Sequence, residues 1–102
     1  MIPEYIRYEL KTHSAQELVA AYAAAGEHLQ AAPECLGYEL SQCADAEDIF
    51  ILCILWRSAQ DHLEGFRKGP HFPPFLALIR PFIGEMVEMR HYEPTAVTWR
   101  HA

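Results

Sequence analysis

The chain has 102 residues and a formal net charge of −6, and its basic residues are scattered without a Lys/Arg run, which argues against a nucleic-acid partner. This length suits one domain over residues 1–102. The hydrophobic fraction of 51% lies slightly above the range of about 45–50% for soluble proteins. Some apolar surface is therefore expected to meet a partner, the alternative being a monomer with a rich core.

The first third of the chain predicts a strand followed by a helix. Alternation predicts a half-buried strand over about residues 3–11, and the apolar positions that share one parity are Ile2, Ile6, Tyr8 and Leu10. Ser14 followed by Glu17 is the pattern of a capping box. An apolar stripe at helical spacing then predicts an amphipathic helix that ends before Pro33. Its members are Leu18, Tyr22, Ala25 and Leu29.

The middle of the chain predicts two strands joined by a turn. Leu36–Cys43 alternates between apolar and polar residues, and the polar stretch 43–48 suits the turn. Ile49–Trp56 is apolar on both parities. A strand of this kind has to be covered on both faces.

The last part predicts a helix in two pieces and a final strand. A helix start at Ser58 leads to a short helix ending near Lys68, before a Gly-Pro pair. The second piece ends at Pro81, and its apolar residues at helical spacing are Phe72, Phe75, Leu76 and Ile79. Residues 84–93 predict the last strand. One side of it carries Met86, Glu88, Arg90 and Tyr92, and the other carries Val87, Met89 and His91.

The element order is therefore β-α-β-β-α-β, which defines the ferredoxin-like α+β fold, with a core over about residues 1–93 and a tail over 94–102. Its four-stranded antiparallel sheet has helices on one face. The other face would be bare, and a second copy of the chain is the simplest cover for it. We therefore expect a homodimer through the open sheet face, which is a dimeric α+β barrel.

We also expect a cytoplasmic protein without a membrane partner. The three cysteines contain no C-x-x-C pair and are odd in number, which favours free thiols in a reducing compartment. The first eleven residues lack the basic segment and apolar core of a signal peptide. The longest apolar run, Ile49–Trp56, has eight residues, whereas a bilayer span needs ~20.

Two segments of the chain, Leu55–Phe72 and Glu88–Glu93, resemble the antibiotic biosynthesis monooxygenase family. In that family a strand ends in Trp, a Ser, Thr or Asp begins a helix, and a His-Phe pair follows near the helix end. The matching positions here are Trp56, Ser58, His71 and Phe72. With the element order, the resemblance covers about residues 1–93. It implies the dimeric barrel and, for several members, oxidation of phenols or quinols to quinones by O₂ without metal or flavin.

The sequence also departs from the family pattern. Members often carry a His about where Phe66 stands, and a phenyl ring cannot move a proton. The haem-degrading branch relies on an Asn, a Trp and a His, and this chain contains no Asn. Haem degradation is therefore disfavoured, and Asn-assisted oxygenation is not available.

The candidate catalytic residues are His71, His62 and Trp56. A histidine with a pKa near 6.5 can act as a base at neutral pH, His71 lies at the family's His-Phe position, and Trp56 could donate its indole N–H to a substrate oxygen. The candidate substrate-binding residues are Tyr22, Tyr38, Phe66, Phe72, Phe75 and His91, and Arg67 or Arg90 could pair with an anion. Core packing explains the aromatic set equally well.

The spacing of the histidines argues against a metal, because no His-x₃-His or His-Glu-x-x-His motif is present. The resemblance implies that no cofactor is needed. Two interpretations remain open. The first is a cofactor-independent monooxygenase that acts on a small aromatic phenol or quinol. The second is a non-catalytic dimeric module that binds a small ligand.

Overall fold

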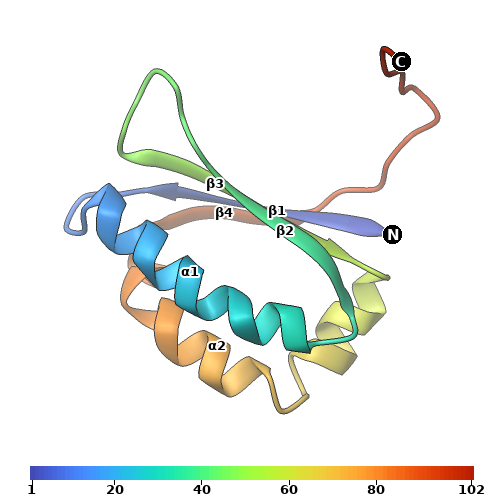
Figure 1. Ribbon diagram of the computed structural model, residues 1–102, viewed down its shortest axis with the longest axis horizontal. Helices are drawn as coiled ribbons and strands as arrows, with labels where there is room; N and C mark the ends of the chain where they lie inside the picture. Colours follow the sequence, from blue (N-terminus) through green and yellow to red (C-terminus); the bar gives the residue numbers. More distant parts are fainter.

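The computed structural model describes residues 1–102 and contains one antiparallel sheet with its helices on one face (Figure 1). The strands are β1 (Ile2–Glu9), β2 (Cys35–Gln42), β3 (Ile49–Trp56) and β4 (Met86–His91), in the spatial order β2-β3-β1-β4. The helical elements are α1 (Ala15–Ala31), the π-helical turn η1 (Asp61–Phe66), α2 (Phe72–Ile79) and the 3₁₀ turn η2 (Arg80–Glu85). The predicted ferredoxin-like α+β fold is confirmed.

Helix α1 begins where its sequence predicts. The Ser14 hydroxyl accepts the Glu17 backbone N–H at 3.1 Å, and the Glu17 carboxylate accepts the Ser14 backbone N–H at 2.8 Å. These reciprocal bonds satisfy two backbone donors that the helix itself leaves free. The helix ends at Ala31, before Pro33, and buries the predicted stripe against the sheet.

Alternation along the two central strands decides which side chains meet the helices. In β3 the even-numbered residues are buried under the helices, and the odd-numbered ones are half-buried on the other face. This second, open face carries Ile49, Ile51, Cys53 and Leu55 along β3. Neither α1 nor α2 covers it (Figure 1).

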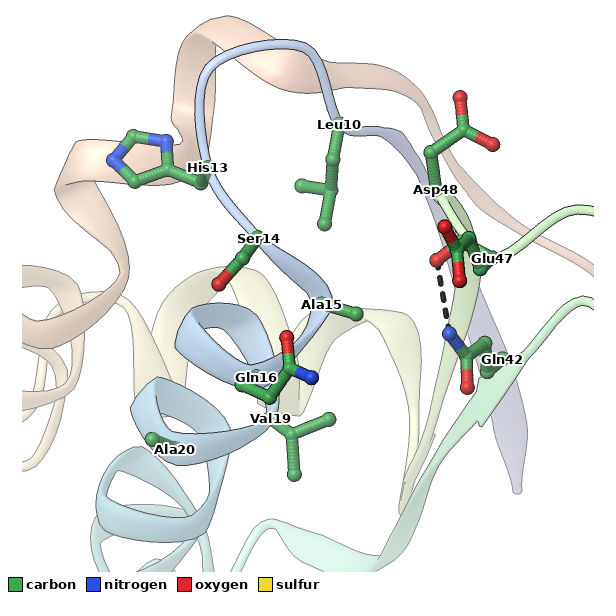
Figure 2. Close-up of a pocket in the computed structure, with 10 residues that line it drawn as sticks. All are labelled: Leu10, His13, Ser14, Ala15, Gln16, Val19, Ala20, Gln42, Glu47 and Asp48. Atoms are coloured by element: carbon green, nitrogen blue, oxygen red, sulfur yellow. Dashed lines mark hydrogen bonds between the residues drawn. The ribbon is translucent and has the colours of Figure 1, made fainter.

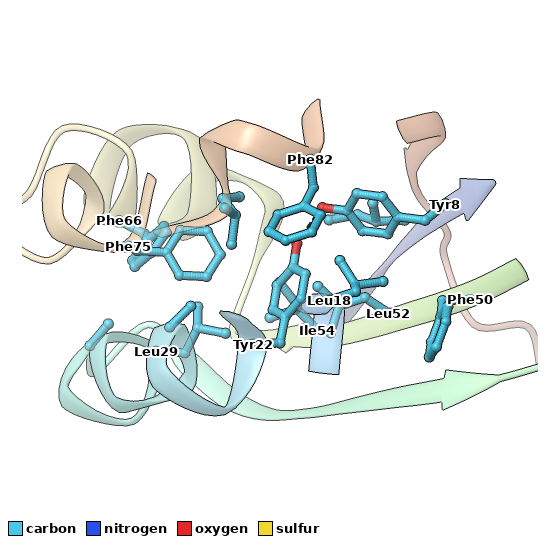
Figure 3. Packing of buried hydrophobic residues seen from close by; sticks show 14 of the residues in the cluster. Tyr8, Leu18, Tyr22, Leu29, Phe50, Leu52, Ile54, Phe66, Phe75 and Phe82 are labelled. Atoms are coloured by element: carbon cyan, nitrogen blue, oxygen red, sulfur yellow. Dashed lines mark hydrogen bonds between the residues drawn. The ribbon is translucent and has the colours of Figure 1, made fainter. Parts of the chain in front are cut away.

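A buried polar contact joins α1 to the sheet inside the core. Tyr8 of β1 and Tyr22 of α1 point their hydroxyls at each other, 2.5 Å apart, beside Phe82 (Figure 3). Burial raises the pKa of Tyr8 to about 12, so both groups stay protonated and one hydroxyl donates to the other. Because every buried side-chain polar atom has a partner, this bond fixes α1 against the sheet without an unpaired group.

The helical segment after β3 differs from its prediction. The short helix expected up to Lys68 is a π-helical turn that ends at Phe66. Pro81 does not end the following helical piece, since it lies in the first turn of η2, where a missing N–H costs nothing, and the chain stays helical up to Glu85. The last strand consequently starts at Met86 rather than at residue 84.

The predicted faces of β4 are partly wrong. A register shift in β1 between Arg7 and Tyr8 changes the pairing, so that Met86 lies opposite Tyr8. Met86 therefore faces the helices together with Met89 and His91, not the open face with Arg90. A bulge of this kind adds a residue to one strand, which simple alternation cannot anticipate.

Residues 94–102 extend away from the sheet as an irregular tail (Figure 1). Trp99 in this tail is 77% exposed and stacks edge-on against His101. None of the helices combines the length and the apolar character that crossing a membrane requires.

Candidate active site

A pocket of about 190 Å³ lies between the β1–β4 side of the sheet and the segment from η1 to η2. Its walls are almost entirely apolar, and they include Ile6, Ile54, Phe66, Phe72, Phe75, Leu76, Ile79, Ile83, Met86 and Met89. The polar lining comes from Glu4, Trp56, His62 and Arg67. An apolar cavity with a few convergent polar groups is the usual form of a small-molecule site.

Glu4 is the centre of the polar end. Its side chain is buried, with 1% of the residue exposed, and its Oε1 accepts a hydrogen bond from Trp56 Nε1 at 3.0 Å. Burial raises the pKa of the Glu4 carboxyl, although Trp56, His91 and Arg67 oppose the shift. Burial therefore disfavours the ionised form of this carboxyl relative to an exposed one.

His62 lies between Trp56 and His91. Its ring stacks on the Trp56 indole with 4.2 Å between centroids and 7° between planes. Arg67 Nε donates to His62 Nε2 at 3.3 Å, and His62 Nδ1 is 2.8 Å from His91 Nε2. Because a guanidinium always donates, neutral His62 carries its proton on Nδ1 and donates it to His91.

His62 remains uncharged over the physiological pH range. Burial is the main cause that lowers the pKa of His62 to about 3, and the nearby Arg67 guanidinium and His91 ring add to it. The ring is therefore a hydrogen-bond acceptor at Nε2 and a donor at Nδ1.

Three separate segments position this cluster. Glu4 and His91 are direct partners in the β1–β4 register, and both side chains face the helices. His62 comes from η1, and π-helical turns often occur at functional sites. Arg67 follows η1, with its guanidinium 5.9 Å from the centre of the Phe72 ring.

Most of the predicted site residues meet at this pocket. Trp56, His62, Phe66, Phe72 and Phe75 line it, and His91 contacts it through His62. Three predicted residues lie elsewhere. His71 lines a separate pocket of about 240 Å³ beside Pro33 and Glu34. Tyr22 is bonded to Tyr8 in the core, and the Tyr38 hydroxyl accepts from Gln30 Nε2 at 2.7 Å.

Glu4 was missed by the sequence reasoning, although a signal was available. It occupies the apolar parity of β1, between Ile2 and Ile6, where the alternation calls for another apolar residue. A charged residue on the buried face of a strand has to be paired or functional. That position marks the polar end of the pocket.

A larger hollow of about 730 Å³ lies elsewhere, between the start of α1 and the β2–β3 turn (Figure 2). Most of its lining is polar, and Gln42 Nε2 crosses to the Glu47 carbonyl at 2.9 Å. Its ionisable side chains, His13, Glu47 and Asp48, are not buried. This hollow has no buried titratable side chain comparable to Glu4 in the pocket of about 190 Å³.

The fold and pocket define a small α+β domain with a mostly apolar pocket between the sheet and its helices. Residues 1–77 match the model of the antibiotic biosynthesis monooxygenase family, and the chain belongs to this family. The protein YczJ of Bacillus subtilis is 24% identical over 93 residues, which cover 91% of this chain and 98% of YczJ.

Solved structures of similar fold agree with this assignment. A proposed antibiotic biosynthesis monooxygenase from Bordetella bronchiseptica superposes with a TM-score of 0.80 at 20% identity, over 92% of this chain and 96% of that one. SnoaB, a cofactor-independent oxygenase from Streptomyces nogalater, gives a TM-score of 0.71 at 14% identity, over 96% of this chain and 94% of SnoaB. At these identities the likeness establishes the fold.

Proposed function

We propose that the protein is a cofactor-independent monooxygenase that oxidises a small phenol or quinol with O₂ in the pocket beside Trp56. The observation that carries this proposal is the buried carboxyl of Glu4 at the polar end of an apolar cavity. Family membership and the likeness in fold to the oxygenase SnoaB support it.

The size of the pocket favours a substrate with one aromatic ring. An apolar cavity of about 150 Å³ accommodates benzene, and this pocket has about 190 Å³. The difference leaves room for a hydroxyl and one or two small substituents. The aromatic walls formed by Phe66, Phe72 and Phe75 suit edge-to-face contacts with such a ring.

In this proposal the substrate hydroxyl lies at the polar end, and Glu4 accepts its proton. Burial raises the pKa of Glu4. This moves it in the direction of the pKa that suits a base acting near neutral pH. His62 stays neutral, and its Nε2 accepts from Arg67 while its Nδ1 bonds the half-buried His91, so it positions the groups around Glu4. The Arg67 guanidinium stabilises the phenolate that forms.

The phenolate then reacts with O₂ without an external reductant. A phenol with a free para carbon supplies all four electrons, since one oxygen atom enters the ring and the other leaves as water, giving a para-quinone. The apolar walls keep bulk water away from the electron-rich ring. Trp56 positions the base, because its indole N–H bonds Glu4 and its ring stacks on His62.

The proposal includes a homodimer in the cytoplasm, formed through the open sheet face. The half-buried odd-numbered residues of β3 form an apolar band on that face, next to Tyr5 of β1. Burying the same face of a second copy would cover it with a self-complementary surface. The core over residues 1–93 would form this association.

Oxygen consumption with a panel of one-ring phenols and hydroquinones tests the proposal, in buffer freed of metal by a chelator. We expect turnover that Glu4→Gln and His62→Gln each reduce by about 10²–10⁴-fold. His71→Ala is the matched control, because His71 lies outside the pocket. Equal losses of turnover in His71→Ala and Glu4→Gln would contradict the assignment of the reaction to this pocket.

The alternative, a binding module without chemistry, is favoured by Phe66 at a position where family members often carry His. A thermal-shift screen with the same panel separates the two. Ligands that raise the melting temperature and are recovered unchanged in air would establish binding without oxidation. That result would refute the monooxygenase proposal.

A further inference from the structure

We infer that Glu4, His62 and His91 form a binding site for a divalent transition-metal ion such as zinc or ferrous iron. The three side chains come from β1, η1 and β4, and one donor atom of each lies within 4.8 Å of the other two. Along the chain, His62 lies 58 residues after Glu4, and His91 lies 29 residues after His62. No spacing motif within one helix would therefore reveal them.

The distances are close to those that an ion requires. Two nitrogen ligands with bonds of about 2.0–2.1 Å lie about 3.0–3.4 Å apart around an octahedral or tetrahedral ion. His62 Nδ1 and His91 Nε2 are 2.8 Å apart, and Glu4 Oε1 is 3.8 Å from His62 Nε2. These two contacts use different nitrogens of His62, whereas a single ion takes one donor atom from each residue, and such a set of three lies within 4.8 Å. Rotation of the rings and the carboxylate has to shorten the longest separation, and the ion then replaces the proton between the two histidines.

The donor set determines which ions fit. Two imidazoles and one carboxylate suit zinc, and the same set forms the facial triad that binds ferrous iron. Magnesium and calcium prefer all-oxygen sites, which Glu4 alone does not supply. Three protein ligands leave further coordination positions, and these would open toward the pocket, since Glu4 and His62 both line it.

Neighbouring residues orient the three proposed ligands, as residues around the ligands do in metal proteins. Trp56 donates to the Glu4 carboxylate at 3.0 Å and stacks on His62, so it orients two of the three ligands. Backbone register holds the third, because His91 is the direct cross-strand partner of Glu4. Glu4 and His62 are 1% and 3% exposed, which shields them from competing water.

Arg67 is the group that opposes binding. Its guanidinium Nε bonds His62 Nε2 at 3.3 Å and brings a positive charge next to the site. An ion has to displace this contact or tolerate the repulsion. Replacing Arg67 by a neutral residue of similar length is therefore expected to tighten metal binding, whereas removal of any ligand weakens it.

This inference rests on the geometry of three side chains and does not depend on the proposed oxidation. It does bear on that reaction, because a bound ion occupies the lone pair that the Glu4 carboxylate would offer to a proton. Saturating zinc is thus expected to slow the metal-free oxidation, and a chelator to restore it.

Titration of the chelator-treated full chain with Co²⁺, followed by visible absorption and by calorimetry, tests the site. We expect one ion per chain with the ligand-field bands of a nitrogen–oxygen site. Glu4→Gln and His91→Ala should each weaken binding by about tenfold or more, and Arg67→Met should strengthen it. His28→Ala, which changes a half-buried histidine in the last turn of α1 that belongs neither to the pocket nor to the three-residue cluster, is the matched control.

Binding of equal strength in wild type, Glu4→Gln and His91→Ala would overturn the inference, as would a cobalt–thiolate band, which would assign the ion to a cysteine. Circular dichroism of each variant shows whether it is folded, and His91→Ala changes a residue near the end of the edge strand β4. Loss of Co²⁺ binding with oxidation intact would support the site and leave the proposed function standing.

Discussion

The uncharged state of His62 predicts how stability depends on pH. The pKa of His62 falls from its ordinary value of 6.5 to about 3 in the folded chain, chiefly because the ring is buried. Between these two values the unfolded chain binds a proton that the folded chain does not, so stability falls as the pH falls below 6.5. From pH 8 to pH 5 the loss from this group alone is about 2 kcal/mol.

Urea denaturation of wild type and His62→Gln, at pH 8 and pH 5 and at one protein concentration, measures this loss. Glu4 acts in the opposite direction, since a raised carboxyl pKa adds stability as the pH falls. The variant keeps Glu4, so the difference between the two proteins isolates His62. A chelator in the buffer keeps metal out of the comparison.

We expect wild type to lose about 2 kcal/mol more than His62→Gln between the two pH values. Parallel pH dependences would refute the reasoning, because they would mean that the folded chain protonates His62 as readily as the unfolded one. The same result would remove the neutral acceptor at Nε2 from the proposed reaction.

Three further predictions concern the fold and its assembly. Ser14→Ala removes the N-cap acceptor of α1 and should cost about 1 kcal/mol, and an unchanged urea midpoint would show that the capping box is not needed. Tyr22→Phe leaves the buried Tyr8 hydroxyl unpaired and should cost about 1–3 kcal/mol, while Tyr8→Phe added to it should cost less than the sum of the two single changes. Ile51→Glu, on the open face, should shift a dimeric mass toward a monomeric one by light scattering, and a monomeric wild type would refute the barrel.

The local part of the fold was predictable because its signals lie within short stretches of sequence. The alternation of β1, the two-sided apolar run of β3 and the Ser14–Glu17 pair each specify an element through contacts a few residues apart. The register shift between Arg7 and Tyr8 was not predictable in this way. It arises from the pairing of strands at opposite ends of the chain.

The site was predictable in part for the same reason. Trp56 and His62 could be named because they lie in one short segment that resembles the family. The meeting of His62 with His91 depends on how η1 packs over the sheet, which no local pattern encodes. His71, placed in the site by its family position, instead faces a separate pocket beside Glu34 because the chain turns at Gly69 and Pro70 before α2 begins.

Glu4 provides the strongest argument that this pocket has a function rather than a role in packing alone. Nothing in the sheet requires a carboxyl between Ile2 and Ile6, and burial raises its pKa, so the ionised form is disfavoured in the folded chain. Glu4→Gln keeps an acceptor for the Trp56 N–H and removes the ionisable group. We therefore expect Glu4→Gln to be more stable than wild type at pH 8, by an amount that shrinks as the pH falls toward 5, while losing oxidation and metal binding. A variant less stable than wild type at pH 8, as measured by urea denaturation, would mean that the ionised carboxylate stabilises the fold, and the functional argument from its burial would fail.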